Sequence, residues 1–146
     1  MAPVDDEARR IFRLAGEDPL RAYEIVERQL AVLVLRTQVL LSLSGIVITV
    51  TGFSGRTIAQ SGDVARMFIA SGIVMVLLAA GVAIRGVLRL RWLTQELTED
   101  PIATLTRALA LRDQKSRALA IALVLFVMGF SLYVVAIAQL LWNARP

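Results

Sequence analysis

The chain contains no cysteine and no histidine. The lack of cysteine excludes disulfides and thiol nucleophiles, and the lack of both excludes zinc sites of the usual kind. The commonest general base is also missing. No phosphate-binding loop, nucleophile–base pair or dinucleotide fingerprint is present. We therefore expect a protein that is not an enzyme, with no catalytic, cofactor-binding or metal-binding residues.

Charged residues are scarce and unevenly placed. They make up 19% of the 146 residues, while 57% are hydrophobic; soluble domains average about 25% and 45–50%. Residues 37–55, 67–84 and 118–144 contain no charge at all. About 20 apolar helical residues cross the hydrocarbon core of a bilayer. The pattern excludes a soluble globular protein and predicts an all-α membrane protein with three transmembrane helices, at about 37–55, 67–84 and 118–140.

Basic residues fall almost entirely on one side of these spans. With the N-terminus inside, thirteen Lys and Arg residues lie in residues 1–36 and 85–117, and three lie in the 54–66 loop and the tail. Lys and Arg accumulate on the cytoplasmic side of membrane spans. We therefore predict a cytoplasmic N-terminus and an external C-terminus. This topology also accounts for the net charge of +4, so nucleic acid is not an expected partner.

The composition further suggests a location. Fifteen of the 16 basic residues are arginine, and alanine and leucine are abundant, which is typical of GC-rich bacterial genomes. The first 30 residues hold 12 charges and no apolar stretch, so we expect no cleavable signal peptide. The expected location is the bacterial inner membrane, with the first span as an uncleaved signal anchor.

Two Asp-Pro pairs, at 18–19 and 100–101, predict where two long helices begin. Aspartate is a good N-cap, and proline suits the first helical position because its missing N–H has no partner there. We expect helices from Pro19 to about Phe53 and from Pro101 to about Trp142, both longer than a bilayer requires. The second span should also continue inward. The predicted cytoplasmic extensions are 19–36, 85–97 and 101–117.

These extensions carry apolar residues at helical spacing, such as Ile25 and Leu33 on the first and Leu105 and Leu109 on the third. Their apolar faces need cover, which a short cytoplasmic helical bundle would provide. The solvated face of that bundle is expected to carry the charged residues Glu24, Glu27, Arg28, Arg107, Arg112 and Asp113.

The chain divides into an N-terminal helix, 1–16, and a three-span membrane domain, 17–146. From Asp5 to Ala15 the sequence is amphipathic, and Gly16 can close the helix. Two interpretations stay open. The helix lies on the inner leaflet with its arginines at the headgroups, or it packs on the cytoplasmic part of its own protein.

A face of polar and small residues follows the first span. Its members, spaced by four and three, are Gln38, Ser42, Gly45, Thr49 and Gly52. Small residues allow close helix approach, and hydroxyls bond across helices or to their own carbonyls. The face is therefore a packing face, against the other spans or a neighbouring subunit, or it lines a narrow pore in an oligomer.

Three arginines stand at the inner edges of the spans: Arg36, Arg85 and Arg117. They are candidate contacts for anionic lipid headgroups, although topology alone explains them about as well. The pairs Ala79-xxx-Ala83 and Ala118-xxx-Ala122 match a helix-packing pattern that is frequent by chance in an alanine-rich chain. No acid, lysine or histidine lies inside the spans, which argues against a pump or an ion-coupled transporter.

Two stretches resemble a known group of proteins. Residues 36–46 (RTQVLLSLSGI) have a polar start, a Leu-Leu pair and small residues, and residues 112–119 (RDQKSRAL) form a charged approach to the last span. In these features the chain is similar to the SLATT and Pycsar membrane effectors of bacteria. The resemblance implies a small membrane protein that oligomerises and disrupts the membrane when triggered. The chain has no separate nucleotide-sensing domain, which puts a cyclic-nucleotide trigger in doubt, and no functional residue is carried over.

The sequence thus predicts a non-enzymatic inner-membrane protein that acts as a homo-oligomer, as a pore or a membrane-perturbing assembly. The alternative is a structural or adaptor subunit whose cytoplasmic helices dock a partner protein, and a third option is a lipid-binding accessory factor. The expected partners are the lipid bilayer, further copies of the chain and, in the alternative, a cytoplasmic protein.

Overall fold

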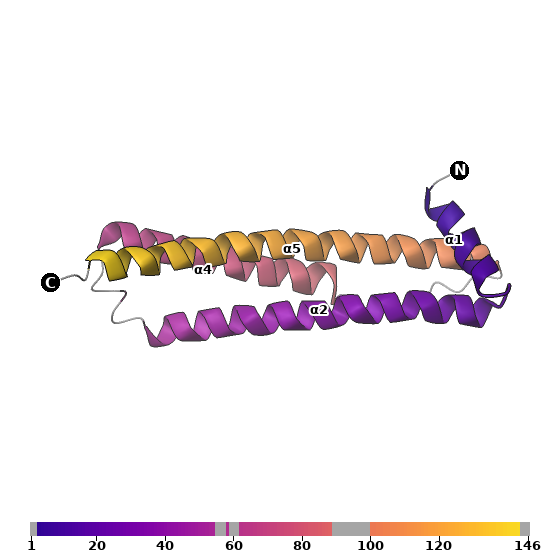
Figure 1. The fold of residues 1–146 in the computed structure, drawn as a ribbon, viewed down its shortest axis with the longest axis horizontal. Coiled ribbons are helices and arrows are strands. Elements are labelled where there is room, and N and C mark those ends of the chain that lie inside the picture. The colour runs from indigo at the N-terminus through magenta and orange to yellow at the C-terminus, as the bar shows by residue number, and fades with distance from the viewer. Residues whose placement is uncertain (1–2, 55–57, 59–61, 89–99, 144–146) are drawn as a thin grey trace.

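The computed structural model describes residues 3–54, 58, 62–88 and 100–143. Within them lie the α-helices α1 (Pro3–Leu14), α2 (Pro19–Phe53), α4 (Asp63–Gly86) and α5 (Pro101–Asn143). Helices α2 and α5 run in the same direction along the whole length of the molecule (Figure 1). Helix α4 runs in the opposite direction beside one half of them, and α1 crosses the other end. The predicted all-α fold is confirmed.

Both long helices begin where the Asp-Pro pairs predict. Oδ1 of Asp18 accepts the backbone N–H of Leu20 at 2.9 Å, and Oδ1 of Asp100 accepts that of Ile102 at 2.9 Å. Each carboxylate thereby satisfies an N–H that has no partner inside the helix. Helix α2 ends at the predicted Phe53, and α5 ends one residue beyond the predicted end.

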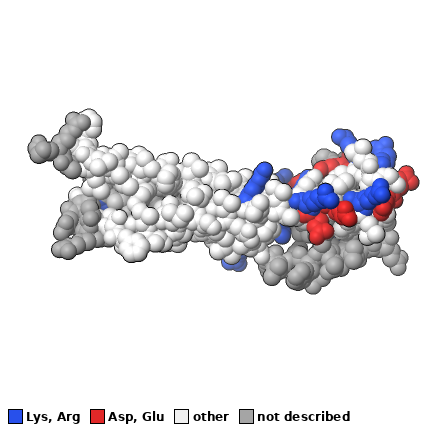
Figure 2. All heavy atoms as spheres, turned by 60° about the horizontal axis from the view of Figure 1, so that its bottom comes forward, with Lys and Arg blue, Asp and Glu red and all other residues white. Residues whose placement is uncertain are grey.

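Helices α2, α4 and α5 are long and apolar enough to cross a membrane. In their most apolar windows only 22%, 28% and 17% of the residues are buried inside the chain. Figure 2 shows the result: most charged side chains gather at one end, and the rest of this face is almost entirely uncharged. An apolar surface of this extent requires a cover other than water, and a bilayer supplies it. The chain is a multi-span helical membrane protein.

One predicted extension needs correction. Helix α4 ends at Gly86, so it does not continue through the described part of residues 85–97. Glycine weakens a helix, and Gly86 is the last residue of α4. Residues 89–97, with the predicted interface residue Trp92, lie outside the described residues. In the described part, two long helices and α1 therefore build the charged end.

Helix α1 packs on its own protein, which is the second of the two interpretations of residues 5–15. An apolar cluster unites α1, α2 and α5, and its buried members are Ala8, Ala15, Ala22, Val26, Leu105, Ala108 and Leu109. The apolar residues Ile11 and Phe12 pack against this cluster. The amphipathic helix thus buries its apolar side in the chain, while Arg9, Arg10 and Arg13 stay exposed.

A tight turn places α1 across α2. Gly16 has φ +72° and Glu17 has φ +61°, in the left-handed region that glycine adopts at little cost. The N–H of Glu17 donates to the carbonyl of Phe12 at 3.0 Å, and that of Gly16 donates to Arg13 at 3.1 Å. These two bonds form a Schellman motif, which satisfies carbonyls at the end of α1. Gly16 therefore closes the helix, as the sequence predicts.

Candidate functional site

Helices α4 and α5 approach each other closely along a row of small residues. A Cβ on Gly72 would lie 2.7 Å from the carbonyl oxygen of Gly129, and a Cβ on Gly129 would lie 2.7 Å from that of Gly72. A Cβ on Gly86 would collide with Ala118. The fit therefore requires glycine, as in other membrane helix pairs built on small residues. The small residues of this seam recur every seven positions, as Ala65, Gly72, Ala79 and Gly86 on α4 and Ala122, Gly129 and Ala136 on α5.

Helix α2 contacts the other two spans with a different set of residues. Its buried side repeats every seven positions, with Val26, Leu33, Leu40 and Val47 in one row and Thr37, Ser44 and Thr51 in the other. Each buried hydroxyl donates to the carbonyl four residues earlier, at 2.8, 2.8 and 2.7 Å. The hydroxyls are thus satisfied within α2. These residues favour the contact because they are small and let the helices approach, not because they hydrogen-bond across it.

The face that the sequence singles out lies on the other side of α2. Its five residues, Gln38, Ser42, Gly45, Thr49 and Gly52, are all exposed. At about 100° per residue this face is centred about 140° from the buried one. A Cβ on Gly45 or Gly52 would meet nothing within 4 Å. The face therefore does not pack against α4 or α5, and its role between copies or along a pore stays a prediction.

Arg112 of α5 is the centre of the charged end. Its Nη1 donates to Oε1 of Glu7 at 2.7 Å and to Oε1 of Gln29 at 2.9 Å. Its Nη2 donates to Oε2 of Glu7 at 3.1 Å and to Oδ1 of Asp113 at 2.7 Å, and its Nε donates to the same Oδ1 at 2.9 Å. A guanidinium has five N–H groups, so every donor of Arg112 is used. One side chain thereby joins α1, α2 and α5.

The position of Arg112 corrects the prediction that it lies on the solvated face of the bundle. Its side chain is only 18% exposed. The partners that cover it, Glu7 and Gln29, come from α1 and α2, 105 and 83 residues away in the sequence. The hydrogen bond with Glu7 raises its pKa above the ordinary value, burial opposes this, and Asp113 raises it further. Arg112 is therefore a permanently charged structural tie and not a docking contact.

Four other charges of the predicted solvated face, Glu24, Glu27, Arg28 and Arg107, are exposed, and Asp113 is half-buried. The ion pair of Glu24 with Arg28 measures 3.8 Å, and both side chains are more than half exposed. Exposed pairs of this kind contribute little to stability. They leave the surface of the charged end to solvent.

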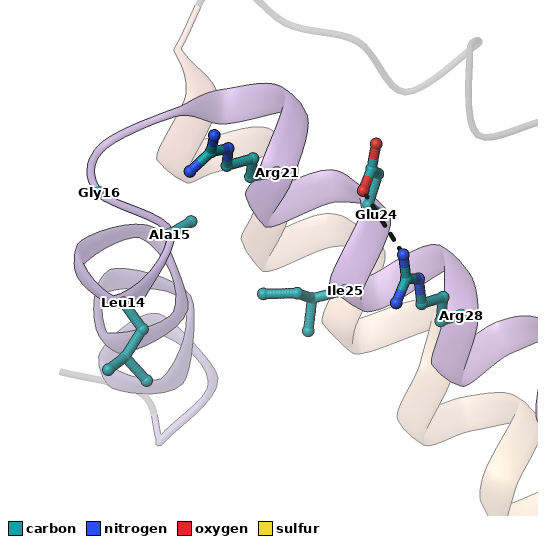
Figure 3. Close-up of a pocket in the computed structure, with 7 residues that line it drawn as sticks. All are labelled: Leu14, Ala15, Gly16, Arg21, Glu24, Ile25 and Arg28. Atoms are coloured by element: carbon teal, nitrogen blue, oxygen red, sulfur yellow. Dashed lines mark ion pairs between the residues drawn. The ribbon is translucent and has the colours of Figure 1, made fainter.

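A hollow of about 390 Å³ opens between the end of α1 and the first turns of α2. Figure 3 shows Ile25 pointing from α2 toward α1, with Arg21 and the Glu24–Arg28 pair along the α2 side. The side chain of Leu14, at the end of α1, is 79% exposed. The hollow is open and partly apolar, and it is lined by only two elements.

The three boundary arginines, Arg36, Arg85 and Arg117, are exposed on three different helices. They stand next to the charge-free parts of α2, α4 and α5. Within the described residues no group of carboxylates could hold a metal ion. The boundary thus offers cationic side chains to a ligand, and their contact with lipid headgroups stays a prediction.

No known protein family, curated protein or solved structure matches the chain. Its function must therefore be argued from its own residues.

Sequence reasoning missed three features of the site. The buried row of Thr37, Ser44 and Thr51 and the glycine row of α4 both repeat every seven residues, so a search for this period would have found them. The set of contacts around Arg112 has no such signal in the sequence. Nothing in the local sequence distinguishes it from Arg107 or Arg117, since its partners come from two distant helices.

Proposed function

We propose that the chain is a non-enzymatic membrane protein that works as a homo-oligomer, with the exposed face of α2 as the contact between copies. The observation that carries this is the open space over Gly45 and Gly52. A glycine inside a helix costs about 1 kcal/mol relative to alanine. Gly72 and Gly129 are required by their contact with each other, whereas no contact among the described residues requires Gly45 or Gly52.

Close approach of a second helix would explain why glycine stands at positions 45 and 52. Small residues let two helix backbones meet in a membrane, where association depends on packing. The face offers glycine and hydroxyl residues in rows that repeat every seven positions, as the seam between α4 and α5 does. Gln38 supports the same conclusion, because no described residue hydrogen-bonds its amide and a polar group near hydrocarbon gains from a partner. The occupant that fits is α2 of another copy.

In the alternative arrangement, copies form a wider ring in which this face surrounds an axis instead of contacting a neighbouring α2. Gln38, Ser42 and Thr49 would then meet water along a narrow path, while the outward surfaces of α4 and α5 meet lipid. This arrangement is a pore or a membrane-perturbing assembly, in line with the resemblance to the SLATT and Pycsar effectors. We place it in the bacterial inner membrane, with the charged end in the cytoplasm, because of the distribution of basic residues.

Leucine substitutions test the contact between copies. Gly45→Leu should weaken self-association in nanodiscs by about tenfold or more, because the new side chain separates the helices. The matched control is Gly81→Leu on α4, an exposed glycine with equally open space. The measurement is the oligomer distribution as a function of protein concentration. Equal effects of the two substitutions would overturn the role of α2.

Conductance tests the pore. Purified protein in liposomes should conduct ions, and Ser42→Leu or Thr49→Leu should abolish the current, whereas Thr49→Ser should retain it because the hydroxyl and the small volume remain. Since the chain has no cysteine, single-cysteine variants at these positions can also be tested for block by a thiol reagent. Absence of current in every oligomeric state would refute the pore and leave the assembly itself standing.

An adaptor role is the second candidate, and one observation favours it. Leu14 and Leu20 are 79% and 77% exposed at the charged end, outside the apolar spans, and Leu14 lines the hollow of Figure 3. A partner protein with an apolar helix would cover them. A photo-crosslinking residue at position 14 should then give one discrete product with another protein in cells. A product of this chain alone would favour the homo-oligomer.

A further inference from the structure

A second hollow, of about 380 Å³, lies between α2 and α5 where the charged end meets the apolar spans. Arg36, which lines it, is the last charged residue before the first span, and Ser116 lies two residues before the last charge-free window. From Gln29 to Arg36 the hollow extends about 10 Å along α2, comparable to one headgroup layer of a bilayer. Its place in the fold is therefore the level of lipid headgroups.

Three donors in this hollow are free to bind a phosphate. No described carboxylate pairs with the exposed guanidinium of Arg36. The side-chain oxygen of Gln29 accepts a hydrogen bond from Arg112, so the N–H groups of its side-chain amide remain available. The hydroxyl of Ser116 is exposed. Arginine, amide and hydroxyl donors are the groups that bind phosphate oxygens.

The hollow also contains an acceptor. Arg112 lines it without a free N–H, because all five are bonded within the chain. These bonds hold Asp113 through its Oδ1 only. The Oδ2 of Asp113 makes no hydrogen bond with the described residues, and the side chain is 41% exposed. A primary ammonium would bind there as a charge-assisted donor.

The charges around the hollow balance, with two positive and two negative groups. Arg36 and Arg112 are positive, and Asp113 and the Glu7 paired with Arg112 are negative. A ligand with one phosphate and one ammonium matches this balance better than a purely anionic ligand. We propose that the hollow binds the phosphoethanolamine headgroup of a phospholipid, with its phosphate on Arg36, Gln29 and Ser116 and its ammonium on Asp113. This lipid site does not depend on self-association through the opposite face of α2.

Lipid competition tests the site. The full chain is placed in nanodiscs of phosphatidylcholine with a minor fraction of phosphatidylethanolamine or phosphatidylglycerol, and bound lipid is measured by native mass spectrometry. Phosphatidylethanolamine should be retained preferentially, because the quaternary ammonium of phosphatidylcholine donates no hydrogen bond and phosphatidylglycerol has no ammonium. Equal or stronger retention of phosphatidylglycerol would overturn the proposal.

Variants separate the two parts of the headgroup. Arg36→Gln should reduce retention of phosphatidylethanolamine by about tenfold, the effect of losing a charge-assisted hydrogen bond. Asp113→Asn should remove the preference over phosphatidylcholine and keep the phosphate contact. Ser116→Phe fills the hollow without changing charge and should reduce retention as Arg36→Gln does. An unchanged preference in Asp113→Asn, or unchanged retention in Ser116→Phe, would refute the assignment.

Two controls complete the test. Arg85→Gln removes the same charge at the boundary of α4, beside a hollow whose described lining comes from residues 81–88 alone. It should leave retention of phosphatidylethanolamine unchanged, and a loss equal to that of Arg36→Gln would show general attraction to the membrane and no site. Free phosphoethanolamine should not displace the lipid, and displacement at a matched concentration would assign the site to a soluble ligand. Gly45→Leu should leave lipid retention intact even if the proposed oligomer is absent.

Discussion

Helices α4 and α5 are held together by backbone contact, whereas α2 is held to them by side chains. Between α4 and α5 the glycines at 72 and 129 leave no room for a Cβ. Along α2 the contact consists of apolar residues and hydroxyls that are bonded to their own helix. The difference teaches that the role of a glycine in a membrane helix depends on its neighbours, since Gly72 lies in a close seam and Gly45 on an open face.

The same comparison shows how the three spans are organised. Helices α4 and α5 form the closely packed pair, and α2 joins it along one side. Specific polar attachment of α2 is concentrated at the charged end, where Gln29 bonds Arg112 and the α1 cluster packs on both long helices. Helix α2 is therefore the span best placed to adjust its position in the proposed contact with a second copy.

The largest effect should come from a substitution that forces α4 and α5 apart at their seam. Gly72→Ala adds a single atom that would lie 2.7 Å from a backbone oxygen, so α4 and α5 must move apart. We expect a loss of about 2 kcal/mol or more in the free energy of unfolding, measured by titration with denaturing detergent and circular dichroism. Gly81→Ala, with nothing within 4 Å, should be neutral or slightly stabilising. Equal losses would contradict the distinction between the two kinds of glycine.

A smaller effect should follow from cutting the tie at the charged end. Arg112→Gln leaves Glu7 without its cation and should cost about 1–2 kcal/mol, because water partly replaces the lost contact. Helix α1 should then detach, which increases hydrogen exchange of its amides and exposes a cysteine placed at the buried Ala8. Arg28→Gln, which breaks only the exposed pair with Glu24, should cost under about 0.5 kcal/mol. Unchanged protection of α1 in Arg112→Gln would refute the role of the tie.

The pH dependence of this tie follows from the sign of its shift. The pKa of Arg112 is raised in the folded chain. The stabilisation is therefore fully present below the pKa of the unfolded chain and is lost only as the pH rises through the folded value. Both lie far above neutrality, so the docking of α1 should not weaken between about pH 6 and pH 9 through Arg112. Deprotection of α1 in that interval in the wild type, absent from Arg112→Gln, would contradict this.

The smallest effect should come from the hydroxyls of α2. Ser44 is buried and donates to the carbonyl of Leu40 at 2.8 Å, so it has no bond across the seam to lose. Ser44→Ala should therefore change the free energy of unfolding by less than about 1 kcal/mol. The exposed Ser131, which donates to Val127 in the same way, provides the matched Ser131→Ala control. A much larger loss for Ser44→Ala would indicate a role across the helix contact.

The helix limits could be predicted from the sequence because their causes are local. Asp18 and Asp100 bond N–H groups two residues away, and the charge-free windows identify the spans without any tertiary information. The end of α4 was not predicted, since Leu88, Trp92 and Leu97 continue an apolar pattern beyond Gly86. An apolar pattern indicates which residues need cover, and it does not indicate where the helix that carries them ends.

The site was less predictable because its contacts are not local. A polar face on a helix is visible in the sequence, yet the side that turns toward the other spans depends on how α4 and α5 fit together. The row of Thr37, Ser44 and Thr51 and the face of Gly45 and Gly52 are both polar, and only the fold separates them. The partners of Arg112 lie on helices that the sequence places far away.

Because α2 extends well beyond the proposed membrane span, a small change in its tilt displaces its far end by several ångströms. Residues 19–36 project about 25 Å at 1.5 Å per residue, and α1 is fixed at their tip. A change of about 10° in the tilt of α2, small against the range of tilts seen for membrane helices, would swing α1 by about 4 Å. A small rearrangement among the spans would therefore move α1, outside the membrane, far enough to change which residues it contacts.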